Sequence, residues 1–408
     1  MRPGVIAVIS LVSAIVGAVV VLLIGTATGI VDTDGTETVF LPTDTVDLTF
    51  DGASRNQPTA RPLAGNGFDP VRIYGARSAG VVTIHAFFDG NADERHASQG
   101  SGFVVSSQGI ILTSAHVVTT AGESTNTNKS PKGANRVFVG FKDGDRVRAR
   151  IVGWDTFDDV GVLRIDPVAH GLKAVPLGDS SSVVVGEPVA AMGSPFGNED
   201  SLAVGVVSAN ARTIDALTSA YRVTDAIQTD APITHGNSGG PLFDARGRVI
   251  GINAQINSDS GESEGVGFAI PINAAKRSMR QLLASSRVAY GYVGVTTEDL
   301  TPSIARHLGY KVGQGAIVVE VRDGSPGDRA GLRGGNGQET FNGQRISKGG
   351  DVIVAIDGQE VRSADDVVRS VAYRLPGRVT RMTVVRDGRR IDVSVKLGER
   401  PATPDTGR

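Results

Sequence analysis

A serine within a glycine-rich turn is the residue of this chain best suited to nucleophilic chemistry. Residues 236–241 read GNSGGP, with Ser238 preceded and followed by glycines. A serine hydroxyl is a weak nucleophile near neutral pH, so it needs a base to take its proton and donors for the oxyanion that forms. Glycine tolerates backbone conformations that other residues avoid. We therefore expect the amides of Gly236 and Ser238 to converge as an oxyanion hole.

The base that this serine requires is predicted to be His116. It follows a small residue in the apolar stretch LTSAHVV, residues 112–118. His235 adjoins the serine turn and is interpreted as a loop residue that can touch substrate. A surface or structural role is expected for the histidines without such a context, namely His85, His96, His170 and His307.

An aspartate between His116 and Ser238 in the sequence should orient the imidazole. Three candidates lie close together: Asp155, Asp158 and Asp159. Residues 160–165 (VGVLRI) read as a short strand, and side chains alternate faces along a strand. Asp158 would therefore place its carboxylate on the opposite face from Asp159. We favour Asp159 and keep Asp158 as the alternative. The chain order His116, Asp159, Ser238 is that of the chymotrypsin-type triad.

With these motifs in place, the chain resembles the HtrA (DegP/DegS-like) family of trypsin-like serine proteases with a C-terminal PDZ domain. The resemblance covers about residues 71–397 and departs from the family at Thr234 and His235, where a polar residue and proline are usual. It implies a mainly β protease with two closed six-stranded barrels and the triad between them. The matching segments are residues 99–104, 113–118, 159–163, 193–197, 228–231, 236–241, 251–253 and 265–271.

The resemblance also implies a substrate pocket and regulatory elements. The pocket for the residue before the scissile bond should be walled by Ile233, Ala254 and Val266. These side chains offer no acid to a basic residue, so we expect small or medium aliphatic residues there, such as Val or Ala. Arg212 matches an arginine that senses allosteric state in similar proteases. Residues 211–221 and 257–264 match activation loops.

The protease domain is predicted over residues 69–272 as an all-β segment. Two alternating runs, residues 136–141 and 146–151, flank Asp143-Gly144, which is a hairpin signal. Residues 119–135 are interpreted as a surface insertion. Further strands are expected at residues 102–105, 110–113, 160–165, 188–191, 202–209, 249–252 and 266–270.

A linker helix over 273–289 and a PDZ domain over 290–397 are predicted next. The helix should bury a stripe of Ile272, Ala275, Met279, Leu282 and Leu283. Within the PDZ-like segment, the insertion 334–348 is expected to form a hairpin. Residues 363–374 should form a helix with Ser363 as N-cap.

The loop that would bind a peptide's terminal carboxylate through backbone N–H groups matches Tyr292, Val293, Gly294 and Val295. The peptide would add a strand to the edge of the sheet. Residues 398–408 are predicted to be a disordered tail.

The N-terminal apolar run, residues 5–24, is long enough for a membrane helix. Twenty residues rise ~30 Å, the thickness of a bilayer's hydrocarbon core. We expect an uncleaved signal anchor with Arg2 inside and the rest of the chain extracytoplasmic; a cleavable signal peptide is the alternative. Residues 32–68 are polar and are interpreted as a flexible linker.

Composition excludes several other functions. The net charge of −2 offers no electrostatic footprint for nucleic acid, and the absence of cysteine excludes zinc-thiolate and thiol redox chemistry. No metal or other cofactor is expected.

The favoured function is a membrane-anchored serine endopeptidase that degrades unfolded or damaged proteins under stress, with a PDZ domain that binds peptide C-termini. Processing of a single membrane substrate is a variant of it. The alternative is a catalytically silent chaperone or PDZ scaffold. The resemblance further implies a homotrimer formed through residues 69–76.

Overall fold

The computed structural model describes residues 67–88, 97–122, 131–193, 201–219, 221–234, 236–254 and 266–402. The predicted membrane helix, nearly all of the 32–68 linker, His235 and the 257–264 loop lie outside these ranges. Within the described ranges, no helix is both long and apolar enough to cross a membrane.

The first half of the protease forms a closed barrel with strand order β1-β2-β3-β6-β5-β4. The strand β3 is wholly buried, since all five of its residues are buried. The predicted hairpin joins β4 and β5, and Gly144 in its turn has a φ of 86°. The strands are β1 (Val81–Phe87), β2 (Ala97–Ser106), β3 (Ile110–Ser114), β4 (Arg136–Gly140), β5 (Arg146–Asp155) and β6 (Val160–Arg164).

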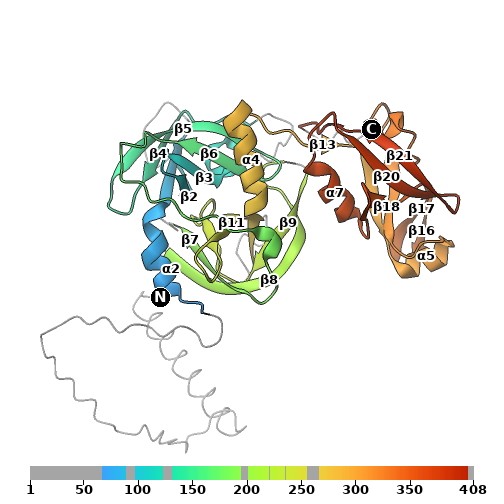
Figure 1. Cartoon of the computed structure of the whole chain (residues 1–408), viewed down its shortest axis with the longest axis horizontal. Coiled ribbons are helices and arrows are strands. Elements are labelled where there is room, and N and C mark those ends of the chain that lie inside the picture. Colours follow the sequence, from blue (N-terminus) through green and yellow to red (C-terminus); the bar gives the residue numbers. More distant parts are fainter. Residues whose placement is uncertain are drawn as a thin grey trace, which may run out of the picture. The chain divides into compact units, whose positions relative to one another are not determined.

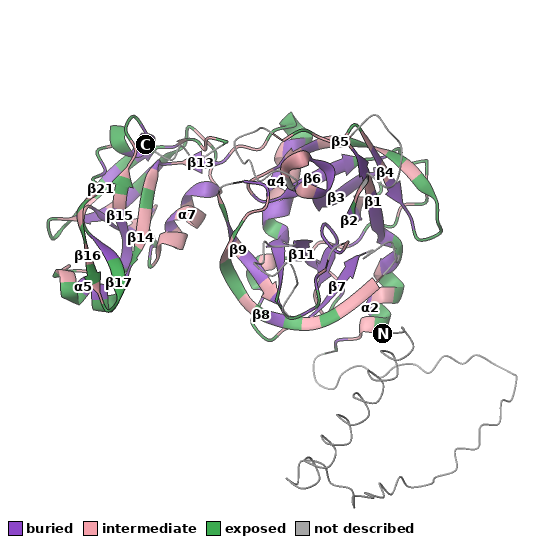
Figure 2. Cartoon of the chain, turned by 180° about the vertical axis from the view of Figure 1, so that it is seen from behind, coloured by how far each residue is buried: buried purple, intermediate pink, exposed green. Residues whose placement is uncertain are grey.

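The second half forms another closed barrel, with strand order β10-β11-β12-β9-β8-β7. The predicted double-barrel fold is thus confirmed (Figure 1). Buried residues fill both barrels, whereas β8 is largely intermediate or exposed (Figure 2). The strands are β7 (Pro188–Gly193), β8 (Ser201–Asp215), β9 (Arg222–Thr229), β10 (Pro241–Phe243), β11 (Val249–Ala254) and β12 (Gly267–Pro271).

Two predicted boundaries of the protease domain are wrong. Residues 211–215, predicted as part of a loop, continue β8, because Ile214 and Asp215 pair with β9 and extend the ladder. Phe68, assigned to the flexible linker, is 2% exposed within the core. It directly precedes Asp69, whose side chain caps α2 (Pro70–Arg77).

A single helix, α4 (Ile272–Ser285), packs against both barrels and leads to the PDZ domain (Figure 1). It buries Ile272, Ala275 and Leu282, as predicted. Leu283 is 42% exposed, so its place in the predicted stripe is wrong. Ser278 instead is fully buried, because its hydroxyl bonds to a carboxylate of the first barrel.

The PDZ domain is built on a sheet with strand order β14-β15-β18-β20-β21, so β14 is an edge strand. Its helices are α5 (Pro302–Leu308), α6 (Pro326–Arg329) and α7 (Ala364–Ala372). Ser363 caps α7 as predicted, in a capping box with Asp366. The strands are β14 (Val295–Leu300), β15 (Gly315–Val321), β18 (Val352–Ile356), β19 (Gln359–Glu360), β20 (Val379–Arg386) and β21 (Arg389–Lys396).

Two further strand pairs extend the PDZ domain. The insertion forms the predicted hairpin, β16 (Gly335–Phe341) with β17 (Gln344–Gly349). At the other end, β13 (Gly291–Tyr292) pairs with β22 (Gly398–Glu399), and the Arg400 amide donates to the Tyr290 carbonyl. The prediction that residues 398–400 are disordered is therefore wrong, since backbone hydrogen bonds hold them to the first strand of the domain.

Candidate active site

The structure brings His116 and Asp159 into direct contact. His116 lies in α3 (Ala115–Val118), immediately after β3, and Asp159 lies immediately before β6. Asp159 Oδ2 is 2.6 Å from the imidazole Nδ1, and Oδ1 accepts the His116 backbone N–H at 2.9 Å. Asp159 is 3% exposed and has a φ of 51°, a left-handed conformation that surrounding contacts must maintain. Its carboxylate thus fixes both the ring and the backbone of His116.

The other two candidate acids have different partners. Asp158 Oδ2 accepts from Arg277 Nη2 of α4 at 2.5 Å. Asp155 Oδ1 accepts the backbone N–H groups of Phe157 and Asp158. Neither carboxylate contacts the imidazole of His116 within the described part of the chain.

The serine turn depends on glycine at two positions. Gly236 has a φ of 96° and Gly239 a φ of 84°. A Cβ added to Gly239 would lie 2.3 Å from the Ser101 carbonyl oxygen and 2.5 Å from Thr113 Oγ1. The Gly239 amide donates to the Asn253 carbonyl at 2.8 Å. No larger residue fits this turn without a shift of the neighbouring backbone.

Two residues of the first barrel hold this turn, and sequence reasoning gave them no role. The Ser101 amide donates to the Ser238 carbonyl at 2.8 Å, and Ser101 Oγ donates to the Gly236 carbonyl at 2.5 Å. Thr113 Oγ1 in turn donates to the Ser101 carbonyl at 2.6 Å. Both residues lie in segments matched to the family. The only sequence signal was the place of Ser101 between Gly100 and Gly102. They join the serine turn to β3, which leads into His116.

Ser238 itself is 4% exposed, and its hydroxyl has no hydrogen-bond partner among the described residues. Catalytic hydrogen bonds are often long or poorly aligned without substrate and tighten in the Michaelis complex. The serine turn lies against the end of β3, since a Cβ added to Gly239 would lie 2.9 Å from the Ser114 amide nitrogen, two residues before His116.

The pKa of His116 reflects two opposing influences. Burial works to lower it, but the charge of Asp159 and the hydrogen bond to that carboxylate together outweigh burial and raise the pKa above its ordinary value. The imidazolium form is therefore stabilised, which suits a base that must hold a proton during the reaction.

The predicted substrate pocket contains two buried side chains and one exposed one. Ile233 and Ala254 are each 4% exposed, whereas Val266 is 40% exposed. Ile233 packs directly against Gly267, because a Cβ added to Gly267 would lie 2.9 Å from Ile233 Cδ1. Ile233 and Ala254 each belong to a cluster of buried hydrophobic residues.

The predicted carboxylate-binding loop of the PDZ domain is a tight turn. Val293 is buried, and its carbonyl accepts the Gly327 amide at 2.7 Å. Gly294 has a φ of 80°, and a Cβ on it would lie 2.3 Å from Ser325 Cβ. Tyr292 belongs to β13, and Val295 begins the edge strand β14.

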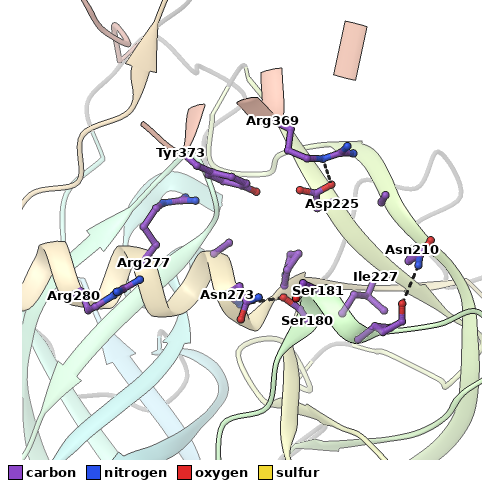
Figure 3. A pocket seen from close by; sticks show the side chains of 14 residues that line it. Ser180, Ser181, Asn210, Asp225, Ile227, Asn273, Arg277, Arg280, Arg369 and Tyr373 are labelled. Atoms are coloured by element: carbon purple, nitrogen blue, oxygen red, sulfur yellow. Dashed lines mark hydrogen bonds and ion pairs between the residues drawn. The ribbon is translucent and has the colours of Figure 1, made fainter. Parts of the chain in front are cut away.

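A cavity of about 600 Å³ lies where α4, β8 and β9 meet α7 of the PDZ domain (Figure 3). Arg369 of α7 donates to Asp225 of β9 at 2.6 Å, while Arg277 of α4 extends toward the ring of Tyr373. Beside the cavity, Thr213 donates to Asp365 at 2.6 Å. The predicted regulatory residue Arg212 bonds instead to Gln228 of its own barrel.

No group of three or more potential metal ligands occurs within the ranges that the structure describes.

Comparison with known proteins agrees with this geometry. Residues 100–252 match the trypsin-like peptidase domain family, and residues 291–397 match the PDZ domain family. A probable periplasmic serine endoprotease, DegP-like, of Hahella chejuensis is 38% identical over 305 residues, which cover 75% of this chain and 58% of the relative. The protein of the same description from Halomonas elongata is 37% identical over 329 residues, 81% of this chain and 62% of the relative. The chain thus spans about three fifths of the length of these curated relatives.

Solved structures match over nearly their whole length. The HtrA-type protease AlgW with tripeptide has a TM-score of 0.66 and 33% identity, covering 83% of this chain and 100% of that one. AlgW with decapeptide has a TM-score of 0.61 and 31% identity, covering 82% of this chain and 99% of that one. The chain belongs to the HtrA-type family of proteases, which joins a trypsin-like peptidase domain to a PDZ domain.

Proposed function

We propose that this protein is a serine endopeptidase in which Ser238 attacks the peptide carbonyl. His116 takes the hydroxyl proton and later gives it to the leaving amine. Asp159 keeps the imidazole in the tautomer with its proton on Nδ1 and stabilises the imidazolium. The amides of Gly236 and Ser238 bind the oxyanion, and water releases the acyl-enzyme.

The observation that carries this proposal is the 2.6 Å contact between His116 and Asp159 next to a serine turn. A fluorophosphonate probe followed by peptide mapping tests it, because the probe reacts with an activated serine. We expect the label on Ser238 and cleavage of casein by the same preparation. An unlabelled protein, or a label on another serine, would favour the alternative of a silent chaperone or scaffold.

The pH dependence of cleavage follows from the raised pKa of His116. The base must be neutral, so activity is lost as the pH falls through this pKa. Because the pKa lies above 6.5, the midpoint of the acid limb of kcat/KM should also lie above 6.5. A series from pH 5 to 9 on a short peptide substrate measures it. A rate that is flat across about pH 5–8 would contradict the role of His116.

Substrate preference follows from the apolar surroundings of Ile233 and Ala254. A Lys or Arg side chain buried there would lack a counter-charge, at a cost of several kcal/mol, roughly 3–5. We expect peptides with Val or Ala before the scissile bond to be cleaved at least about 100-fold faster than matched Lys or Arg peptides. Faster cleavage of the basic peptides would show that these residues do not form the pocket.

The proposed setting is outside the cytoplasm, on unfolded or damaged proteins. The names of the DegP-like relatives, which include "periplasmic", support this location. A single membrane anchor at residues 5–24 and a homotrimer remain part of the proposal.

We further propose that the PDZ domain binds peptide C-termini through residues 292–295 and the open edge of β14. The solved AlgW structures with a tripeptide and a decapeptide are consistent with peptide binding in the family. Contacts such as Arg369–Asp225 and Thr213–Asp365 offer a physical route by which the PDZ domain could influence the protease domain, with Arg212 close by.

A further inference from the structure

Residues outside the first barrel, in α4 and at the start of the PDZ domain, contact the turn that carries Asp159. Residues 156–159 connect β5, which ends at Asp155, to β6, and the catalytic role proposed for Asp159 requires this turn to keep a left-handed residue in place. Asp155 caps the turn, since its Oδ1 accepts the amides of Phe157 at 2.9 Å and Asp158 at 3.4 Å. What holds Asp155 therefore helps to decide where Asp159 lies.

The second oxygen of Asp155 is held by two hydroxyl groups. Tyr290 Oη donates to Asp155 Oδ2 at 2.5 Å, and Ser278 Oγ of α4 donates to the same oxygen at 2.6 Å. Tyr290 is 1% exposed and Asp155 is 2% exposed. Burial chiefly, together with the charges of Asp155 and Asp158, raises the pKa of Tyr290 well above its ordinary value, so the phenol keeps its proton and can donate.

Tyr290 also supports the neighbours of Asp155. Its hydroxyl accepts from Arg277 Nη2 at 2.9 Å, and the same guanidinium nitrogen donates to Asp158. Its ring packs edge-on against Phe157 with centroids 4.8 Å apart. The guanidinium of Arg400 lies over the rings of Tyr290 and Phe157, at 5.1 and 5.4 Å from their centroids. Three residues at this turn, Asp155, Phe157 and Asp158, thus contact either Tyr290 or its partner Arg277.

Tyr290 is itself fixed by the PDZ domain. It directly precedes β13, and its carbonyl accepts the Arg400 amide at 3.0 Å next to the β13–β22 pair. We propose that Tyr290 is a positioning residue for the catalytic acid, acting through Asp155 on the turn that carries Asp159. This inference rests on the proposed peptidase function. It assigns to the first residue of the PDZ segment a part in building the active site, separate from peptide binding.

The test compares single-hydroxyl deletions in the full chain. Tyr290→Phe keeps the ring and removes the donor to Asp155. We expect kcat to fall about tenfold with KM within about twofold, because a displaced orienting acid impairs catalysis more than binding. The acid limb of kcat/KM should also move to lower pH by about half a unit, because Asp159 is the group that raises the pKa of His116.

Matched variants separate positioning from general support. Tyr373→Phe removes another phenol stacked on Arg277, one whose hydroxyl bonds to Thr224 and not to Asp155; it should leave kcat and the acid limb unchanged. Ser278→Ala removes the other donor to Asp155 and favours helix formation in α4, so it should fold and shift both quantities in the same direction as Tyr290→Phe.

Unchanged kcat and acid limb in both Tyr290→Phe and Ser278→Ala would overturn the inference. An equal loss of kcat in Tyr290→Phe and Tyr373→Phe would also overturn it. The same holds for a loss of kcat in Tyr290→Phe without any shift in the pH of the acid limb. An NMR titration of His116 in the same variants distinguishes this failure from that of the proposed function, because it needs no turnover. We expect Tyr290→Phe to lower the His116 pKa even if the fluorophosphonate does not label Ser238.

Discussion

Asp159→Asn is expected to lower kcat by about 10⁴-fold while the protein remains folded. The asparagine amide can present an N–H to His116 Nδ1, which then has to accept a hydrogen bond. The ring proton moves to Nε2, the nitrogen that must take the proton of Ser238, and the base is lost. Steady-state cleavage of a Val-containing peptide measures the effect, with Ser238→Ala as the floor of the assay.

Asp158→Asn is the matched control for this change. Asp158 lies next in the chain and is also buried, but its carboxylate contacts Arg277 and not His116. Loss of that charge leaves the largely buried guanidinium of Arg277 without its charged partner. The free energy of unfolding should therefore fall by about 3 kcal/mol. The kcat of the folded fraction should stay within about tenfold of the natural chain. Equal losses of kcat in the two variants would contradict the assignment of Asp159.

Gly239→Ala is expected to remove more than about 100-fold of the activity and to destabilise the protein by about 3–5 kcal/mol. Two effects combine. The backbone has a φ of 84°, which costs an L-residue about 1–2 kcal/mol, and the new methyl group would lie 2.3 Å from the Ser101 carbonyl oxygen. Relief of that contact has to move the turn that positions Ser238 and the Gly236 amide.

Gly144→Ala separates the two effects. Gly144 has nearly the same φ, 86°, but no atom lies within 4 Å of an added Cβ. This variant should lose only about 1–2 kcal/mol in thermal or urea unfolding and keep full peptidase activity. If Gly144→Ala were as damaging as Gly239→Ala, the contact with Ser101 would not be what makes glycine necessary in the serine turn.

Much of the active site could be predicted because its signals are local. A serine between glycines, a histidine after a small residue and an aspartate before a strand each occupy a few consecutive residues. The choice of Asp159 over Asp158 followed from the alternation of side chains along a strand, and the structure places the two carboxylates against His116 and Arg277 respectively. The barrels were likewise predicted from short alternating runs and from the family resemblance.

The predictions that were wrong concern features that depend on contacts between distant segments of the chain. The extension of β8 to Asp215 depends on pairing with β9, and the order of residues 398–400 depends on pairing with the segment at 290–292. Leu283 has the right spacing for the buried stripe of α4, yet Ser278 is buried because a carboxylate from the first barrel receives its hydroxyl. Periodicity describes one element and cannot show what a partner element offers.

The amino-acid sequence by itself determined the family, the two-domain order and the identity of His116, Asp159 and Ser238 as candidates for the triad. Only the tertiary structure decided which residues support them: Ser101 and Thr113 at the serine turn, and Asp155 with Tyr290 at the acid turn. These supports are hydrogen bonds between segments that are distant along the chain, 135 residues apart for both Ser101–Gly236 and Asp155–Tyr290. Such bonds leave no local pattern, because they exist only once the separate elements have packed together.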